Sequence, residues 1–301
     1  MPKLSRLVSI AALLAALPAA AQAQQPAPAA QAVQPAPDSP EIVVTGERLT
    51  PDQVKSFVDA LTKAPIDGQL SRFERSVCPA AVGLPSPFKE AVLSRIRQVA
   101  VAVGLPVGGP KCAVNLLLIV TRDKPGLLRQ LAHDEPRAFG DMRGGDFRKM
   151  AADPAPAAVW YLKGSVNADG QEMPTDELGQ ASVNKTTRAA SRLNLPARPA
   201  VTGAAIVIDA KALPGLSTTQ LADYAAMRTL ARTDPANLPP SGPPTILKVL
   251  DASPESEVPV TLTPTDLAFL RGLYRTGTVS ANAQRSQIRR EIEKTTAGEK
   301  R

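Results

Sequence analysis

The chain has 301 residues, of which 44% are hydrophobic and 21% are charged. This composition is sufficient for a packed core and argues against wholesale disorder. The formal net charge is +7. The only histidine is His133, so a zinc site built from two or three histidines is excluded. The only cysteines, Cys78 and Cys112, are too few for a zinc ribbon or a four-thiolate iron–sulfur cluster.

The first 23 residues predict a secretory signal peptide. Lys3 and Arg6 precede the apolar segment Leu7–Leu17, and Ala21-Gln22-Ala23 forms a cleavage site of the A-x-A type. The apolar segment is too short to cross a bilayer, and no later segment reaches about 18 apolar residues without a charge. We therefore expect a periplasmic or secreted protein with no transmembrane segment in the mature chain.

Export to an oxidising compartment bears on the two cysteines, because thiols there are usually oxidised to disulfides. We expect a disulfide between Cys78 and Cys112, which would stabilise the fold by about 3–4 kcal/mol in the chain-entropy description of loop closure. Two free buried thiols are the alternative.

Residues 24–49 predict a tether rich in Pro, Ala and Gln that ends in a short β-branched strand. Part of that strand resembles the TonB box of TonB-dependent outer-membrane receptors. The residues that carry this resemblance are Glu41, Ile42, Val43, Val44, Thr45 and Gly46. The resemblance implies a periplasmic, TonB-like protein partner that accepts the segment as an added strand. The alternative is an ordinary edge strand of the domain that follows.

Residues 50–301 are predicted to form a single domain. Thr50-Pro51-Asp52-Gln53 is a capping box that opens a helix extending to about Lys63. Ser86-Pro87 opens a second helix, which Gly104 ends. The apolar run Asn115–Thr121 predicts a central strand that is buried on both faces.

A short helix over Gly126–His133 follows, and then a long surface loop over Arg137–Pro156, a segment rich in glycine and charge. Ala157–Val166 predicts a strand. The next residues predict a turn at Asn167–Gly170, while Thr186–Pro199 shows no clear period.

Ala204–Asp209 predicts another strand, and the capping box at Ser217-Thr218-Thr219-Gln220 opens a helix to about Arg232. A proline-rich loop, a helix capped by Thr263 and a polar helix over Ser280–Thr295 complete the chain. Helices and strands mix without strict βαβ alternation, so the sequence predicts an α+β fold, a mixed sheet with flanking helices.

Two sets of residues are candidates for hydrolytic chemistry. Ser86-Pro87-Phe88-Lys89 matches the S-x-x-K motif, in which Ser86 would be the nucleophile with Lys89 beside it. A helix-capping role is the better explanation of Ser86, because a match to S-x-x-K is expected by chance in a chain of this length. His133 is the only imidazole available as a base, and it falls near a predicted helix C-terminus.

The segment from about residue 204 to 275 resembles the layout of metzincin zinc peptidases: a strand, an active-site helix, a turn and a closing helix. The family's helix carries H-E-x-x-H-x-x-G-x-x-H. In the ungapped register the three ligand positions fall on Ala222, Ala226 and Arg232, and Asp223 takes the place of the glutamate. The resemblance therefore implies a degenerate zincin-like fold without the metal site, that is, a pseudo-peptidase.

Basic residues are scattered and not interleaved with aromatic residues, which argues against nucleic-acid binding. We expect no metal and no cofactor. The sequence thus favours a non-enzymatic periplasmic or envelope-associated binding protein. The alternatives are a hydrolase with an unfamiliar site at Ser86 and Lys89 or at His133, and a module that docks a TonB-like partner through Glu41–Leu49.

Overall fold

The computed structural model describes residues 49–62, 68–173, 184–187, 196–239, 242–252, 256–275 and 280–298. The chain divides into two units, Met1–Thr45 and Gly46–Arg301, and all described residues belong to the second. The expected signal peptide, almost all of the tether and the TonB-box-like residues lie outside the described residues.

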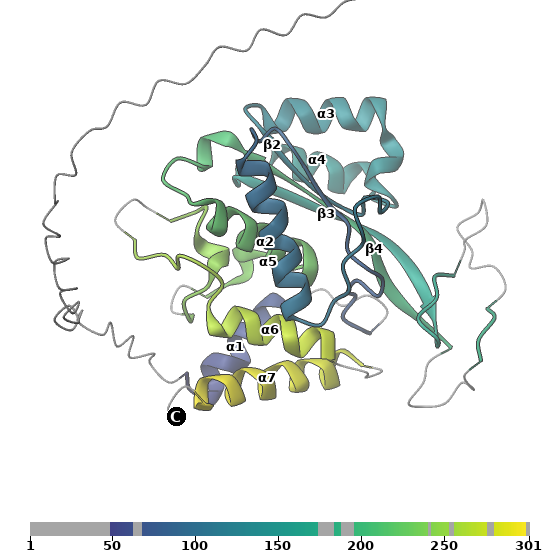
Figure 1. The fold of residues 1–301 in the computed structure, drawn as a ribbon, viewed down its shortest axis with the longest axis vertical. Helices are drawn as coiled ribbons and strands as arrows, with labels where there is room; N and C mark the ends of the chain where they lie inside the picture. Colours follow the sequence, from purple (N-terminus) through teal and green to yellow (C-terminus); the bar gives the residue numbers. More distant parts are fainter. Residues whose placement is uncertain are drawn as a thin grey trace, which may run out of the picture. The chain divides into compact units, whose positions relative to one another are not determined.

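The described part is an α+β fold with one mixed sheet and flanking helices, as predicted (Figure 1). The strands are β1 (Pro79–Val82), β2 (Leu116–Thr121), β3 (Ala157–Asn167) and β4 (Ala197–Asp209). The α-helices are α1 (Pro51–Leu61), α2 (Phe88–Ala102), α3 (Lys124–Asp134), α4 (Gly144–Ala152), α5 (Thr218–Ala231), α6 (Pro264–Arg275) and α7 (Ala281–Gly298). Short 3-10 turns are η1 (Pro136–Phe139), η2 (Ala210–Ala212), η3 (Pro235–Asn237) and η4 (Ile246–Lys248).

The sheet has the order β1-β2-β4-β3. β1, β2 and β4 are parallel, and β3 pairs with β4 in the antiparallel sense. β2 is a central strand, as its apolar sequence predicts, since it has a partner on each side and apolar neighbours on both faces. β3 is left at the edge of the sheet, which matters for the site described below.

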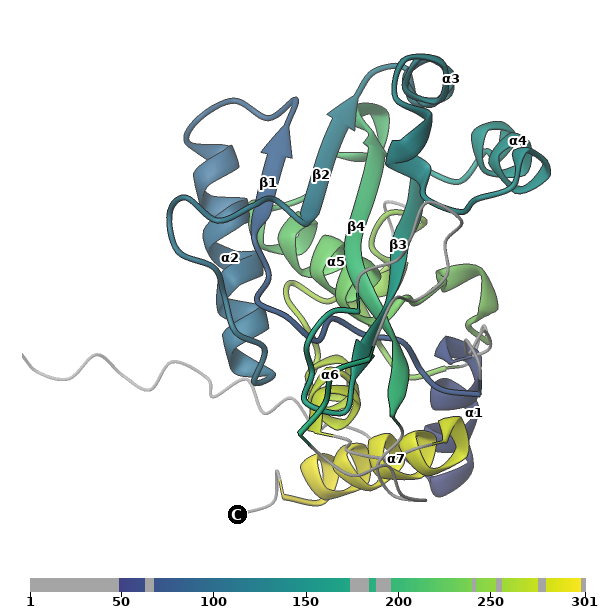
Figure 2. The same ribbon diagram turned by 90° about the vertical axis from the view of Figure 1, so that its right-hand side faces the viewer.

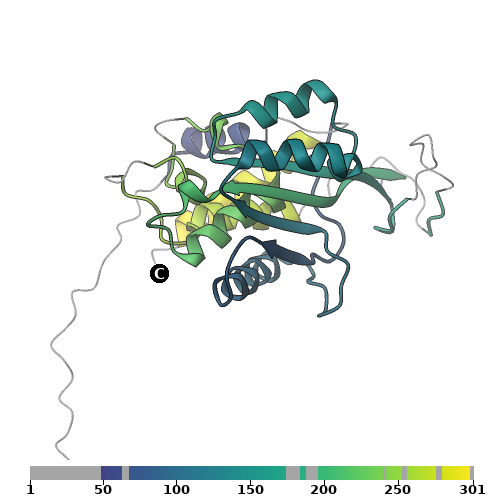
Figure 3. The same ribbon diagram turned by 90° about the horizontal axis from the view of Figure 1, so that it is seen from above.

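Helices cover both faces of the sheet, and Figure 3 shows the layers from above. On one face α3 and α4 pack on a small cluster that includes Phe139, Trp160 and Val207. On the other face α2 and α5 pack on the larger core around Leu118 and Ile206. At one end of the molecule α7 lies against α6 and α1, as Figure 2 shows.

Capping chemistry sets the helix starts that the sequence predicts. At α1 the Thr50 hydroxyl accepts from Gln53 N and the Gln53 side chain accepts from Thr50 N. Ser217 and Gln220 form the same reciprocal pair at α5. Each box satisfies two backbone donors that a helix end leaves open.

The prediction of a surface loop over Arg137–Pro156 is wrong, because this segment contains η1 and α4. Phe147, Met150 and Ala151 recur at helical spacing and pack on the small cluster, with the Phe147 ring 5.1 Å from that of Phe139. Tertiary packing thus stabilises a helix that starts at two glycines without a side-chain cap.

The disulfide between Cys78 and Cys112 is present, as predicted, and it ties the start of β1 to the loop before β2. No other cysteine exists in the chain. Among the helices of the described ranges, none combines the length and the apolar character needed to cross a bilayer.

Candidate functional site

A cavity of about 370 Å³ lies between the start of β3 and one face of α5. Ala157, Ala158 and Val159 form the strand wall, and Tyr224 and Arg228 form the helix wall. Three carboxylates stand at its rim, from Asp153, Asp234 and Asp251. Its volume falls in the range of small-ligand sites, which is about 300–1,000 Å³.

The strand wall presents backbone groups that no strand among the described residues pairs with. Asp209 N donates to Pro156 O at 2.8 Å, and Ala157 lies opposite Ile208 in the antiparallel register. Because partners alternate along an antiparallel pair, Ala158 faces β4 with its N–H and C=O, whereas Ala157 and Val159 direct theirs away from β4. Since β3 is the last strand of the sheet, these groups form an open edge at the cavity.

The helix wall contains a buried charge. Arg228 is 8% exposed, its Nη1 donates to the Tyr224 hydroxyl at 2.8 Å, and its Nε has no hydrogen-bond partner within the described residues. The Tyr161 hydroxyl donates to the backbone carbonyl of Arg228 and so holds this turn of α5 against β3.

The two tyrosines remain neutral phenols at physiological pH. Burial raises the pKa of Tyr161 to about 12 and also raises the pKa of Tyr224, in both cases against the opposing charge of Arg228. A raised phenol pKa disfavours the phenolate, so neither group is suited to act as a base or a nucleophile at neutral pH.

At the rim, partial burial raises the pKa of Asp251. The positive charge of Arg228 opposes this shift, and the neighbouring carboxylates of Asp153 and Asp234 add to it. The three aspartates are exposed, whereas Arg228 is not. The cation that lines the cavity is thus buried, and the three carboxylates that line it are exposed.

The hydrolase candidates lie elsewhere. Ser86 is exposed in the turn between β1 and α2, and Lys89 Nζ is 3.8 Å from the carboxylate of Glu90. His133 is exposed on α3 with Nδ1 2.8 Å from an oxygen of Asp134. None of the three lines the cavity.

The alternative explanation of Ser86 as a helix cap is wrong. The N-cap of α2 is Pro87, and no side chain caps this end. The helix starts one residue later than the serine cap requires, so the hydroxyl does not reach the first-turn donors.

The metal positions implied by the metzincin resemblance do not form a donor set. Ala222 and Ala226 are fully buried in the large core and lack donor atoms. Asp223 is fully buried and binds Arg95, while Arg232 ends the helix in a left-handed conformation. No group of three or more His, Cys, Asp or Glu side chains that could hold a metal occurs in the described part of the chain.

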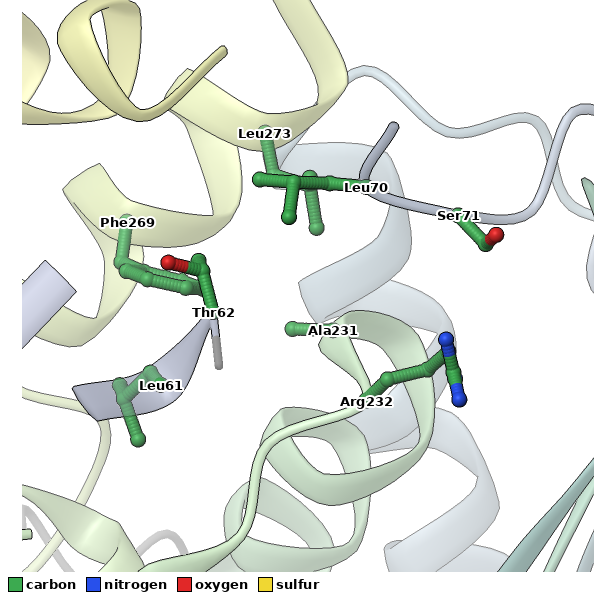
Figure 4. Close-up of a pocket in the computed structure, with 8 residues that line it drawn as sticks. All are labelled: Leu61, Thr62, Leu70, Ser71, Ala231, Arg232, Phe269 and Leu273. Atoms are coloured by element: carbon green, nitrogen blue, oxygen red, sulfur yellow. The ribbon is translucent and has the colours of Figure 1, made fainter. Parts of the chain in front are cut away.

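A second cavity, drawn in Figure 4, lies between α1, α5 and α6. It is lined by apolar side chains such as Leu61 and Phe269, together with Thr62 and Ser71. At about 20 Å³ it has room for roughly one water molecule. The buried Ser71 hydroxyl, which has no partner within the described residues, would be its hydrogen-bonding group.

The sequence alone does not reveal the cavity wall on α5. Tyr224 and Arg228 were recognisable as large residues among small ones on that helix, but their spacing alone does not indicate which side of the helix meets the sheet edge.

Comparison with family models, with curated proteins and with solved structures finds no match for this chain.

Proposed function

We propose that this chain is a non-enzymatic binding protein of the periplasm that holds an extended peptide in the cavity between β3 and α5. The observation that carries this proposal is the open edge of β3 at the cavity, where Ala157 and Val159 direct their backbone groups away from β4. A peptide laid along such an edge gains main-chain hydrogen bonds, and pockets beside it select side chains.

The metzincin resemblance supports the same proposal as a pseudo-peptidase. Strand β4, helix α5, the turn at η4 and helix α6 follow one another in the order that the resemblance implies, and η4 contacts α5.

A periplasmic location agrees with the disulfide, because such bonds persist in oxidising compartments. The docking of a TonB-like partner through Glu41–Leu49 remains a separate prediction, since almost all of that segment lies outside the described residues.

An array of random decapeptides tests the proposal against a pair of variants. Val159→Pro removes the outward N–H from the open edge and leaves the ladder with β4 intact, whereas Val159→Ala keeps that N–H and serves as the matched control. We expect decapeptides that bind the wild type and the alanine variant but bind the proline variant at least tenfold more weakly.

Mass spectrometry of the bound decapeptides should show them uncleaved. Cleavage would contradict the non-enzymatic role. Equal binding by the proline variant, or no binding by any decapeptide, would contradict the site. Thermal unfolding of all three proteins verifies that the variants are folded.

A further inference from the structure

If the cavity binds a peptide, as proposed above, its charged residues indicate which end of the peptide it binds. The side chain of Arg228 lines the cavity and is largely buried, yet few of its hydrogen-bond donors have a partner within the described residues. Of its five N–H groups, one on Nη1 donates to Tyr224, and Nε, which is fully enclosed, has no partner within the described residues. No described carboxylate is within ion-pair distance, which leaves the outer Nη groups as the donors that a ligand could reach. Burying a charge without an ion-pair partner costs free energy. A ligand that supplies hydrogen-bond acceptors and the opposite charge would offset this cost.

The geometry of the arginine side chain indicates which chemical group of a ligand would bind to it. The planar guanidinium presents paired donors that match a carboxylate in a bidentate contact. A contact to a largely buried guanidinium is stronger than the same contact at the surface. A carboxylate is therefore the group that best satisfies Arg228.

The three aspartates at the rim of the cavity favour a positive group on the ligand, opposite in charge to the carboxylate that suits Arg228. Asp153, Asp234 and Asp251 are exposed, so solvent and salt screen their repulsion of an anion at the buried end. Their shared negative charge nevertheless favours a cation at the mouth of the cavity. A ligand that suits both ends carries a carboxylate inside and a positive group outside.

The open edge of β3 adds the third constraint, because it offers hydrogen bonds to an extended main chain and not to a lone ion. A cavity of about 370 Å³ is near the small end of ligand sites and suits the end of a chain better than its middle. We propose that the cavity binds the C-terminal end of an extended peptide, with its free carboxylate on Arg228 and a basic group near the three aspartates.

Isothermal titration calorimetry with three synthetic tripeptides tests this assignment on the unmodified protein. Lys-Ala-Val with a free carboxylate is the probe, its C-terminal amide removes the anion, and Glu-Ala-Val with a free carboxylate reverses the outer charge. We expect the amide to bind at least tenfold more weakly than the acid. The glutamate peptide should also bind more weakly than the lysine peptide, by a ratio that shrinks as salt is raised.

Two variants of Arg228 test whether this residue causes the preference for the free carboxylate over the amide. Arg228→Lys keeps the charge but loses the paired donors, and Arg228→Gln loses the charge. Both should reduce the preference for acid over amide, and Arg228→Gln should abolish it. Because the comparison of acid with amide needs only the wild-type protein, a variant that fails to fold leaves the test intact.

Equal affinity for acid and amide would overturn the carboxylate contact and leave peptide binding at β3 standing. Binding of decapeptides without binding of any tripeptide at millimolar concentration would overturn recognition of the chain end in the same way. Failure of tripeptides and decapeptides alike would overturn both proposals.

Discussion

The ion pair between Arg95 on α2 and Asp223 on α5 should be a major source of stability. Asp223 is fully buried and accepts four hydrogen bonds. Two come from Arg95, whose Nε is 2.7 Å from Oδ1 and whose Nη2 is 3.0 Å from Oδ2. The other two come from the Thr261 hydroxyl at 2.6 Å and from Leu262 N at 2.8 Å.

Asp223→Asn changes this site without changing its volume. An amide oxygen placed at Oδ2 keeps three of the four bonds, but the amide nitrogen then meets Arg95 Nε, donor against donor. Losing a hydrogen bond to a charged group costs about 1.5–3 kcal/mol. Loss of the counter-ion adds to this cost, although the side chain of Arg95 is 32% exposed and can be partly hydrated. We expect a total of about 3 kcal/mol, the lower end of the range for breaking a buried pair.

Urea unfolding followed by circular dichroism measures this loss. A loss of about 3 kcal/mol lowers the unfolding midpoint by roughly 1 M at a slope of about 3 kcal/mol/M. Thr261→Ala removes a hydroxyl that donates to Asp223 and accepts from Arg95 but leaves the ion pair in place, so it is the control and should cost about 1.5 kcal/mol. A loss below about 1 kcal/mol for Asp223→Asn would refute the reasoning, because the pair would then contribute no more than one ordinary hydrogen bond.

Three further predictions concern other parts of the fold. Cys78→Ser should lower the free energy of unfolding by about 3–4 kcal/mol, and alkylation of the unreduced, denatured wild type should label neither thiol; full labelling of both would contradict the disulfide. Gly83→Ala should lower the thermal midpoint sharply, because φ is +81° and a Cβ would lie 1.9 Å from a backbone oxygen of β2, whereas Gly109→Ala meets nothing within 4 Å and should be nearly neutral. Burial raises the pKa of Asp266 against its hydrogen bonds, so the folded protein keeps a proton that the unfolded chain loses, and wild-type stability should fall relative to Asp266→Asn as pH rises above about 4. Urea midpoints of both proteins from pH 3.5 to 7 measure this. A wild-type midpoint that rises relative to that of Asp266→Asn as pH increases would contradict it.

The parts of the fold that could be predicted are those with local chemical signals. The capping boxes at Thr50 and Ser217 involve residues three apart, and their helices begin where predicted. The first half of β4, from Ala197, had no such signal, because it contains Pro199 and is stabilised by pairing with the distant end of β3. α4 was missed for the same reason, since its stability comes from packing on Phe139 and Trp160.

The candidate site, like α4 and the first half of β4, depends on contacts between distant parts of the chain and could not be predicted from local signals. Its strand wall depends on which residues of β3 pair with β4, and its helix wall depends on which side of α5 meets that edge. Residues from Gln220 to Ala231 are all buried, the polar ones included, so polarity does not mark a solvent-exposed side from which the orientation of the helix could be inferred. Only the tertiary arrangement places Arg228 at a cavity and Asp223 at Arg95.

These two buried charges on one helix lead to opposite expectations. Asp223 is completed by groups of the chain itself, so removing its charge should cost stability. Arg228 makes one side-chain hydrogen bond, to Tyr224, and no ion pair with any described carboxylate, so an apolar side chain of similar size removes the cost of burying a charge. We therefore expect Arg228→Met to change the free energy of unfolding by less than about 1 kcal/mol, or to raise it, in the same urea experiment. A loss above about 3 kcal/mol would mean that the fold itself satisfies Arg228. Stability unchanged by Arg228→Met and lowered by Asp223→Asn would separate the two charges by role, with Asp223 holding α5 to α2 and Arg228 available to a ligand.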